Sequence, residues 1–115
     1  MILLVDDEPQ LRKVFARRLR QEGYQVTEAA DGAEAFELLN TAAFNLIITD
    51  LRMPKVDGVK LARLVRAKWP TLPIILLSGG HLPEEASDVM LRGNAHFIQK
   101  PLKPDSLIET VQRLI

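Results

Sequence analysis

Acidic residues stand directly after two apolar runs of the sequence. Asp6, Asp7 and Glu8 follow the first run, and Asp50 follows a later one. Carboxylates held close together repel one another unless a cation lies among them. The chain contains no cysteine, so such a cation would have oxygen ligands, and Mg²⁺ or a similar hard cation is the natural occupant.

A hydroxyl and a lysine occupy similar places after two further apolar runs. Ser78 ends the run at 72–78, and Lys100 follows the run at 95–99. A lysine ammonium and a hydroxyl can both hold the oxygens of a phosphoryl group. Together with Mg²⁺ and a carboxylate, they would form a site that moves a phosphoryl group onto that carboxylate.

Apolar runs alternate with amphipathic patterns along the whole chain. Strands are expected at 2–5, 24–29, 44–50, 72–78 and 95–99, and helices at 8–22, 31–40, 57–68, 83–93 and 103–115. This order predicts a parallel sheet with helices on both faces, joined by right-handed crossovers. Ligands of such sheets bind outside the carboxyl ends of the strands. Since neighbouring strands lie about 4.8 Å apart, the acids after the first and third strands would meet if those strands are neighbours.

Length and composition limit the classes of protein to consider. A chain of 115 residues has the usual size of one domain, so we expect a single domain over 1–115, either free-standing or part of a longer protein. Lysine plus arginine balance aspartate plus glutamate at 15 each, which gives no argument for nucleic acid or an anionic membrane as a partner. No apolar run is long enough to span a membrane, and "MILLV" lacks the basic segment of a signal peptide, so a cytoplasmic location is expected.

Four stretches of the sequence carry a family resemblance, namely "LLVDDEP", "LIITDLRMPKVDG", "PIILLSG" and "HFIQKP". In this order, and at these strand ends, they resemble the receiver domain of bacterial two-component response regulators, of the chemotaxis-regulator type. The resemblance spans the whole chain. It implies a doubly wound, flavodoxin-like α/β fold with five helices and a five-stranded parallel sheet in the order 2-1-3-4-5.

The resemblance assigns roles to the acidic residues. Asp50 matches the phospho-acceptor, which is also a metal ligand. Asp6 and Asp7 match the acidic pair that holds Mg²⁺, Asp7 directly and Asp6 through water. Arg52, two residues after the acceptor, matches the residue whose backbone carbonyl binds the metal.

The resemblance also assigns roles near the ends of the fourth and fifth strands. Ser78 matches the hydroxyl that hydrogen-bonds the phosphoryl group, and Lys100 matches the lysine that pairs with it. Pro101 matches a proline whose preceding peptide bond is cis. Phe97 matches the aromatic residue that changes rotamer on activation, so Ser78 and Phe97 would form the switch.

The chain departs from the commonest family pattern at several positions. The hydroxyl of Ser78 is that of a serine rather than a threonine, and Gly79 and Gly80 follow it. Two glycines are expected to loosen this loop and its coupling to Phe97, which stands where a tyrosine is common. The side chain of Arg52 is expected to reach over the acceptor and to tune the lifetime of the phosphoryl group in either direction.

The function implied by the resemblance is that of a phospho-accepting switch. A sensor histidine kinase or a histidine phosphotransfer protein would supply the phosphoryl group, and the domain would catalyse its own Mg²⁺-dependent phosphorylation and later dephosphorylation. Phosphorylation would shift the domain between inactive and active conformations, for an output domain or target protein that the sequence does not identify. Kinase specificity would lie in surface residues of the first helix, such as Arg12, Arg17 and Arg18.

The sequence also suggests how two copies could associate. A homodimer through the C-terminal helices would use apolar side chains there, with Val89, Met90, Leu107 and Val111 as candidates. All four side chains could equally belong to the core of a single chain.

Three other functions compete with the phospho-switch. A receiver-like module that binds a partner without phosphorylation would be favoured by loss of an acid, the hydroxyl or the lysine, and all are present. A phosphatase of the haloacid-dehalogenase type would need an Asp-x-Asp motif after the first strand and a cap domain. A flavodoxin-like electron carrier would need a Ser/Thr/Gly-rich loop there, where this chain has acids that repel a flavin phosphate.

Overall fold

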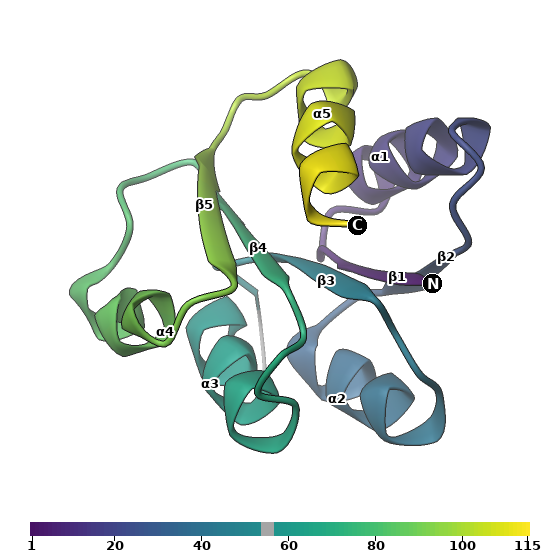
Figure 1. Cartoon of the computed structure of the whole chain (residues 1–115). Coiled ribbons are helices and arrows are strands. Elements are labelled where there is room, and N and C mark those ends of the chain that lie inside the picture. Colours follow the sequence, from purple (N-terminus) through teal and green to yellow (C-terminus); the bar gives the residue numbers. More distant parts are fainter. Residues whose placement is uncertain (54–56) are drawn as a thin grey trace.

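The chain folds into a five-stranded parallel sheet between two layers of helices (Figure 1). The computed structural model describes residues 1–53 and 57–115. Its elements are β1 (Ile2–Val5), α1 (Pro9–Gln21), β2 (Val26–Ala29), α2 (Gly32–Thr41), β3 (Leu46–Asp50), α3 (Gly58–Lys68), β4 (Ile74–Ser78), the short 3-10 helix η1 (Glu84–Ala86), α4 (Ser87–Leu91), β5 (Ala95–Gln99) and α5 (Pro104–Leu114). The strand order is β2-β1-β3-β4-β5, so β1 and β3 are neighbours. The doubly wound, flavodoxin-like fold expected from the sequence is confirmed.

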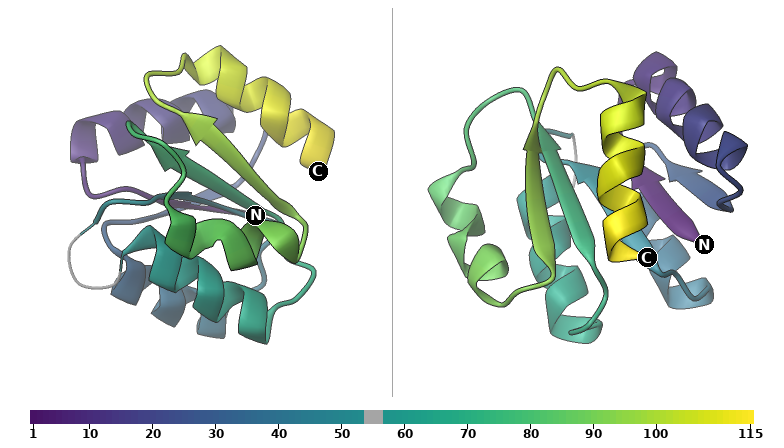
Figure 2. Two further views of the ribbon diagram at one scale, coloured as in Figure 1. Left: turned by 90° about the vertical axis from the view of Figure 1, so that its left-hand side faces the viewer. Right: turned by 45° about the horizontal axis from the view of Figure 1, so that its top comes forward.

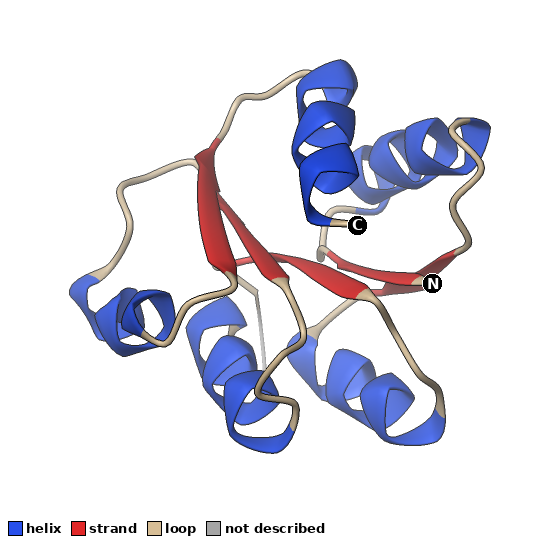
Figure 3. Ribbon diagram, viewed as in Figure 1, coloured by secondary structure: helices blue, strands red, loops and turns tan. Residues whose placement is uncertain are grey.

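Each face of the sheet packs on its own set of helices. Helices α1 and α5 cover one face, and α2, α3 and α4 cover the other (Figures 1 and 3). Alternate residues of β1 point to opposite faces, so Leu4 packs with Phe15 of α1 while Leu3 packs with Leu61 of α3. Because water reaches neither face of the central strands, β1, β3 and β4 read as continuous apolar runs rather than alternating ones.

Two helices begin at aspartate caps. Asp31 accepts a hydrogen bond from the Glu34 amide at 2.9 Å at the start of α2, and Asp57 accepts one from the Lys60 amide at 2.9 Å at the start of α3. A β-carbon on Gly58 would lie 2.1 Å from the carbonyl oxygen of Asp50. Only glycine therefore lets α3 begin directly against the end of β3.

The predicted element boundaries differ in part from the observed ones. Helices α1, α2, α3 and α5 agree with the expected ranges to within one residue, whereas β2, β3 and β4 each begin two residues later than the apolar runs suggest. Residues 24–25 and 72–73, which precede β2 and β4, have no regular structure. The amide of Tyr24 donates to the carbonyl of Leu19, and that of Leu72 donates to the carbonyl of Trp69. Residues 54–56, which belong to the second sequence motif, lie outside the described residues.

The fourth helix is shorter than the pattern predicts. The expected range of 83–93 is divided into the 3-10 helix η1 and a single α-helical segment of five residues, α4. Gly93 and Asn94 follow with φ angles of 83° and 55°. This left-handed backbone ends the helix, because an α-helix cannot continue through it.

Of the two roles that the sequence left open for the four candidate dimer residues, the core role holds for three. Val89, Leu107 and Val111 are at most 1% exposed and belong to the two cores of the single chain. Met90 is half-buried and packs against the core under α2, α3 and α4. The apolar stripe of α5 therefore packs on the face of β1, β3 and β4 that α1 also covers. The rotated views in Figure 2 show α5 on this side of the sheet. Among the described residues, no helix is long and apolar enough to cross a membrane.

Candidate functional site

The acidic residues converge at the carboxyl edge of the sheet. Because β1 and β3 are parallel neighbours, Asp6 follows one strand at the place where Asp50 ends the other. Asp6, Asp7 and Asp50 each offer a carboxylate oxygen, and these oxygens lie within 4.8 Å of one another. A pocket of about 350 Å³ opens above them and is lined by Asp7, Glu8, Asp50, Arg52, Gly79, Gly80 and Lys100.

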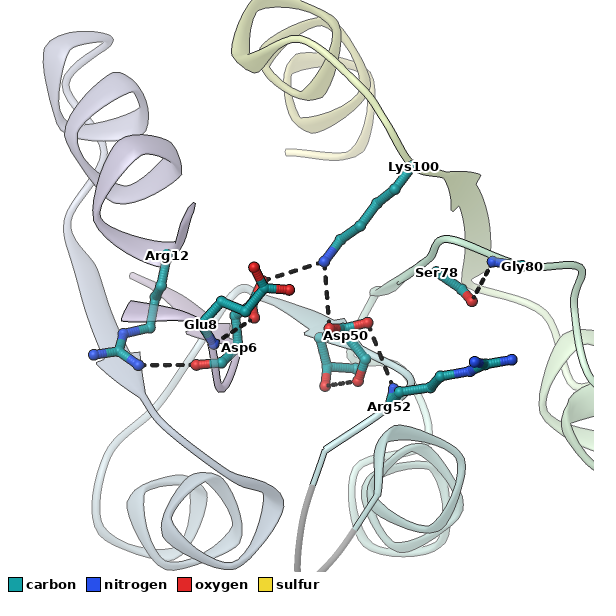
Figure 4. Close-up of polar contacts among 9 residues, drawn as sticks. Asp6, Glu8, Arg12, Asp50, Arg52, Ser78, Gly80 and Lys100 are labelled. Carbon is teal, nitrogen blue, oxygen red and sulfur yellow. Dashed lines mark hydrogen bonds and ion pairs between the residues drawn. The ribbon is translucent and has the colours of Figure 1, made fainter. Parts of the chain in front are cut away.

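Lys100 lies between two of these carboxylates (Figure 4). Its Nζ is 3.3 Å from Oδ2 of Asp50 and 3.4 Å from Oδ2 of Asp6. Burial alone would lower the pKa of Lys100, but the charges of Asp6 and Asp50 and their hydrogen bonds raise it overall. The lysine is therefore held in its charged form at the point where the negative charges meet.

Asp50 is a buried carboxylate with an altered acidity. It is 7% exposed, and burial raises its pKa above the ordinary value. The charge of Lys100 opposes this rise in pKa, and the charge of Asp6 adds to it. A carboxylate whose charged form is poorly solvated is a stronger nucleophile than a free one, which suits Asp50 to attack on phosphorus.

The two acids of the β1 end are held in very different ways. Asp6 is 1% exposed; its Oδ1 accepts from the amide of Glu8 at 2.9 Å, and its own amide donates to the carbonyl of Ala29 at 3.1 Å. Asp7 is exposed at the rim of the pocket. One carboxylate is thus fixed by the protein, while the other is open to a ligand that enters from solvent.

Ser78 is buried at the end of β4 with its hydroxyl engaged locally. It is 2% exposed, and its Oγ accepts from the amide of Gly80 at 3.1 Å (Figure 4). A β-carbon on Gly79 would meet no atom within 4 Å, and one on Gly80 would meet Nη2 of Arg52 at 3.5 Å, an ordinary contact. Neither glycine is therefore required by crowding, and the expected looseness of this loop stays a prediction.

The side chain of Arg52 does not cover the acceptor. It runs toward the loop of Gly80 and away from the carboxylate of Asp50 (Figure 4). The expectation that it reaches over Asp50 is therefore wrong for this conformation. The backbone amide of Arg52 is 3.5 Å from Oδ1 of Asp50, a long and weak contact, and the metal-binding role of its carbonyl stays a prediction.

Two further features were predicted near β5, namely a cis peptide bond before Pro101 and a switch role for Phe97. The Lys100–Pro101 peptide bond is cis, as expected, and the amide of Lys100 donates to the carbonyl of Ser78 at 2.7 Å. Phe97 is half-buried and packs against the core under α2, α3 and α4. Its role as a switch stays a prediction.

The basic residues of α1 are not equally available to a partner. Arg17 is exposed, as expected. Arg18 forms ion pairs with Glu22 at 2.7 Å and with Asp105 of α5 at 2.8 Å. The Arg12 side chain is 13% exposed and pairs with Glu28, so it is less available to a partner than Arg17, and its place in kinase specificity stays a prediction. Helix periodicity places Arg12 on the polar side of α1. It cannot show that the guanidinium donates to the backbone carbonyl of Asp6.

Comparisons with known proteins agree with this geometry. Residues 2–112 match the family model of the response regulator receiver domain. The chain is 37% identical over 111 residues to the transcriptional regulatory protein GlrR of Escherichia coli K12, covering 96% of this chain and 25% of that protein. This chain therefore spans about a quarter of the length of that relative.

Solved structures give the same result. The receiver domain of NtrX from Brucella abortus superimposes with a TM-score of 0.88 at 34% identity, covering 99% of this chain and 97% of that one. The response regulator protein TrrA of Thermotoga maritima, in complex with Mg²⁺ and BeF, superimposes with a TM-score of 0.85 at 32% identity, with the same two coverages of 99% and 97%. The chain belongs to the receiver domain family of two-component response regulators.

Proposed function

We propose that this chain is a phospho-accepting switch that takes a phosphoryl group onto Asp50 from a phosphohistidine of a sensor histidine kinase or a histidine phosphotransfer protein. One observation carries the proposal: the buried Asp50 carboxylate lies 3.3 Å from Lys100 and within 4.8 Å of oxygens of Asp6 and Asp7, below an open pocket. Receiver domains accept phosphate from sensor histidine kinases, so the family and the geometry support the same reaction.

The residues at this edge fit a divalent cation. Asp6, Asp7 and Asp50 bring three carboxylates together, and Lys100, which contacts two of them, offers one positive charge against their three negative ones. All of these ligands are oxygens, and Mg²⁺ typically takes one or two carboxylates, keeps several waters and binds a phosphate group alongside. Asp6, Asp7, Asp50 and the carbonyl of Arg52 would hold Mg²⁺, which would neutralise charge on the phosphoryl oxygens.

The chain's own groups account for the rest of the transfer. An oxygen of the Asp50 carboxylate attacks the phosphorus as the bond between phosphorus and the histidine nitrogen breaks, and the bonding electron pair leaves with the imidazole. Lys100 pairs with the phosphoryl oxygens, and the hydroxyl of Ser78 donates a hydrogen bond to one of them. Hydrolysis of the resulting acyl phosphate returns Asp50 to its carboxylate form.

The phosphoryl group would change the conformation through the contacts it gains. A ligand shifts an equilibrium only as far as it binds one state better than the other. Ser78 and Lys100 are the side chains that would make such contacts, since they end β4 and follow β5. Movement of these two groups would pass to the β4–η1 loop and to Phe97 in β5.

Intact-mass measurement tests this proposal. The chain is incubated with phosphoramidate and MgCl₂, beside an Asp50→Asn variant and an EDTA control. The expected result is one added phosphoryl group that requires both Mg²⁺ and Asp50. Absence of an adduct, together with failure to bind beryllofluoride, would overturn the proposal and favour a docking module that works without phosphorylation.

A further inference from the structure

Arg12 joins the acidic turn to the edge strand of the sheet. It lies in α1, one helical turn after Glu8, and its amide donates to the carbonyl of Glu8 at 2.9 Å. Its guanidinium divides between two acceptors: Nη1 donates to the backbone carbonyl of Asp6 at 2.8 Å, and Nε donates to the carboxylate of Glu28 at 3.0 Å (Figure 4 shows the first). The side chain is 13% exposed, so water competes little for these bonds.

Glu28 is held firmly enough to orient Arg12. It lies in β2, and its second oxygen accepts from Nη1 of Arg20 at 3.3 Å. Burial alone would raise the pKa of Glu28, but the hydrogen bond from Arg12 and the charges of Lys13 and Arg20 lower it overall. Glu28 therefore stays charged near neutral pH and holds the Arg12 guanidinium through Nε, while Nη1 binds the carbonyl of Asp6.

The carbonyl that Arg12 binds belongs to the peptide bond between Asp6 and Asp7. This peptide is planar, so fixing its oxygen limits the direction in which the chain enters Asp7. On the other side of Asp6, the amide donates to Ala29 of β2 at 3.1 Å. The turn is thus held by α1 and β2 together, whereas the exposed carboxylate of Asp7 has no hydrogen bond or ion pair with any other residue that the structure describes.

We propose that Arg12 is a positioning residue for the metal site, which sets the orientation of the Asp6–Asp7 peptide and thereby the affinity for Mg²⁺. This inference rests on the proposed function in taking Mg²⁺ as the cation of the site. Arg12 touches neither the metal nor the phosphoryl group in this role. It acts by holding the carboxylates of Asp6 and Asp7 close together, against their mutual repulsion, in the arrangement that the cation requires.

A matched pair of variants tests the proposal. Arg12→Ala removes the bond to the turn. Arg20→Ala is the control, because it removes an arginine from the same helix and the same glutamate, while the bonds of Arg20 go to Glu28 and to the carbonyl of Val26. Affinity for Mg²⁺ is measured by isothermal titration calorimetry, and urea unfolding reports whether each variant is folded. Groups that orient metal ligands typically change affinity 10- to 100-fold, so we expect Arg12→Ala to weaken Mg²⁺ binding roughly tenfold and Arg20→Ala to change it less than about twofold.

Glu28→Gln provides a second variant in case Arg12→Ala folds poorly. If Glu28 acts through Arg12, Glu28→Gln weakens Mg²⁺ binding in the wild-type chain but adds nothing in the Arg12→Ala background. Equal Mg²⁺ affinities of wild type, Arg12→Ala and Glu28→Gln would overturn the inference.

The phosphoramidate reaction of the wild-type chain separates the two claims. A wild-type chain that binds Mg²⁺ but takes no phosphoryl group would overturn the proposed function, and the affinities of the Arg12 and Arg20 variants would still decide the role of Arg12. A wild-type chain that binds no Mg²⁺ would overturn both. A chain that is phosphorylated, with Arg12→Ala and Arg20→Ala alike in Mg²⁺ affinity, would overturn the role of Arg12 alone.

Discussion

Each end of the sheet holds a cation, half-buried Lys100 at one end and buried Arg66 at the other, and the two cations have different partners. At the carboxyl edge, Lys100 faces the carboxylates of Asp6 and Asp50 beside an open pocket. At the opposite edge, Arg66 of α3 is 3% exposed and its hydrogen bonds go to backbone carbonyls, namely those of Trp69 at 3.3 Å, Pro70 at 2.9 Å, Leu72 at 2.8 Å and Asn94 at 3.0 Å.

This difference separates a structural polar cluster from a functional one. Arg66 donates hydrogen bonds to carbonyls of the loop before β4 and of the loop before β5, and so joins the two loops. Burial lowers the pKa of Arg66, and the charge of Arg92 adds to the effect, so the cation is tolerated there for its hydrogen bonds. Lys100 instead neutralises part of an excess negative charge, which leaves the carboxyl edge ready to exchange partners with a cation and a phosphoryl group.

The largest effect is expected from breaking the structural end. Arg66→Met keeps the apolar stem but removes the Arg66 hydrogen bonds to four carbonyls. The carbonyls of Trp69 and Asn94 still accept from the amides of Leu72 and Ile74, whereas those of Pro70 and Leu72 lose the guanidinium donor. We therefore expect the free energy of unfolding to fall by about 3 kcal/mol. Mg²⁺ affinity and phosphorylation of the folded protein should not change. Urea unfolding and calorimetry check this, with the exposed Arg92→Met as control. A loss of Mg²⁺ affinity would show that the two edges are coupled.

A smaller and reversible effect is expected at the functional end. Lys100→Met leaves Asp6 and Asp50 facing each other without the ammonium, so we expect the metal-free chain to lose about 2 kcal/mol of stability. Saturating Mg²⁺ should restore most of this loss, because the cation binds the folded state and replaces the missing charge. Urea unfolding with and without Mg²⁺ measures it, with the exposed Lys103→Met as control. If Mg²⁺ stabilised the Arg66→Met variant to the same extent, the contrast between the ends would be lost.

The pH dependence of stability sharpens the comparison further. The folded-state pKa of Asp50 is raised above its ordinary value of 3.8. Asp50 therefore contributes stability that is fully present below pH 3.8 and is lost as the pH rises through the folded-state pKa. Relative to wild type, Asp50→Asn should gain stability over this window in the absence of Mg²⁺, by about 1.4 kcal/mol for each unit of pKa shift. Urea unfolding midpoints of wild type and Asp50→Asn, measured between pH 4 and 8, check this. A difference between the two midpoints that stays constant over this range would contradict the prediction.

The smallest effect is expected in the loop of Ser78. A β-carbon at Gly80 would meet Nη2 of Arg52 at 3.5 Å and Oγ of Ser78 at 3.9 Å, both ordinary contacts. Gly80→Ala should therefore raise stability by about 0.4–1 kcal/mol through the unfolded state. The same change at Gly58, where the new carbon would lie 2.1 Å from the Asp50 carbonyl, should be strongly destabilising. Thermal unfolding of both variants measures this difference. A destabilised Gly80→Ala would indicate that the loop needs glycine for its conformation.

Much of the candidate site could be predicted because it follows from the strand ends. Continuous apolar runs mark buried parallel strands, and the residues directly after them must share an edge, which is why Asp6, Asp50 and Lys100 were found together. The inward paths of Arg12 and Arg66 could not be predicted, because their acceptors include backbone carbonyls that no sequence pattern marks. The stripe on α5 was ambiguous, since core and dimer contacts have the same periodicity, and Leu107 proved to be core.

The pairing of β1 with β3 also determines how the chain must fold. Ile2 pairs with Leu46, so the centre of the sheet forms only when a long loop containing β2 closes. Sheets built from such distant pairs fold slowly compared with helical bundles. The closure that forms this pair also brings the carboxylates of Asp6 and Asp50 together, so like charges approach in the step that closes the longest loop between paired strands. A divalent cation added during refolding would therefore lower the barrier if the strand ends are already ordered in the transition state, and would only slow unfolding if they order afterwards.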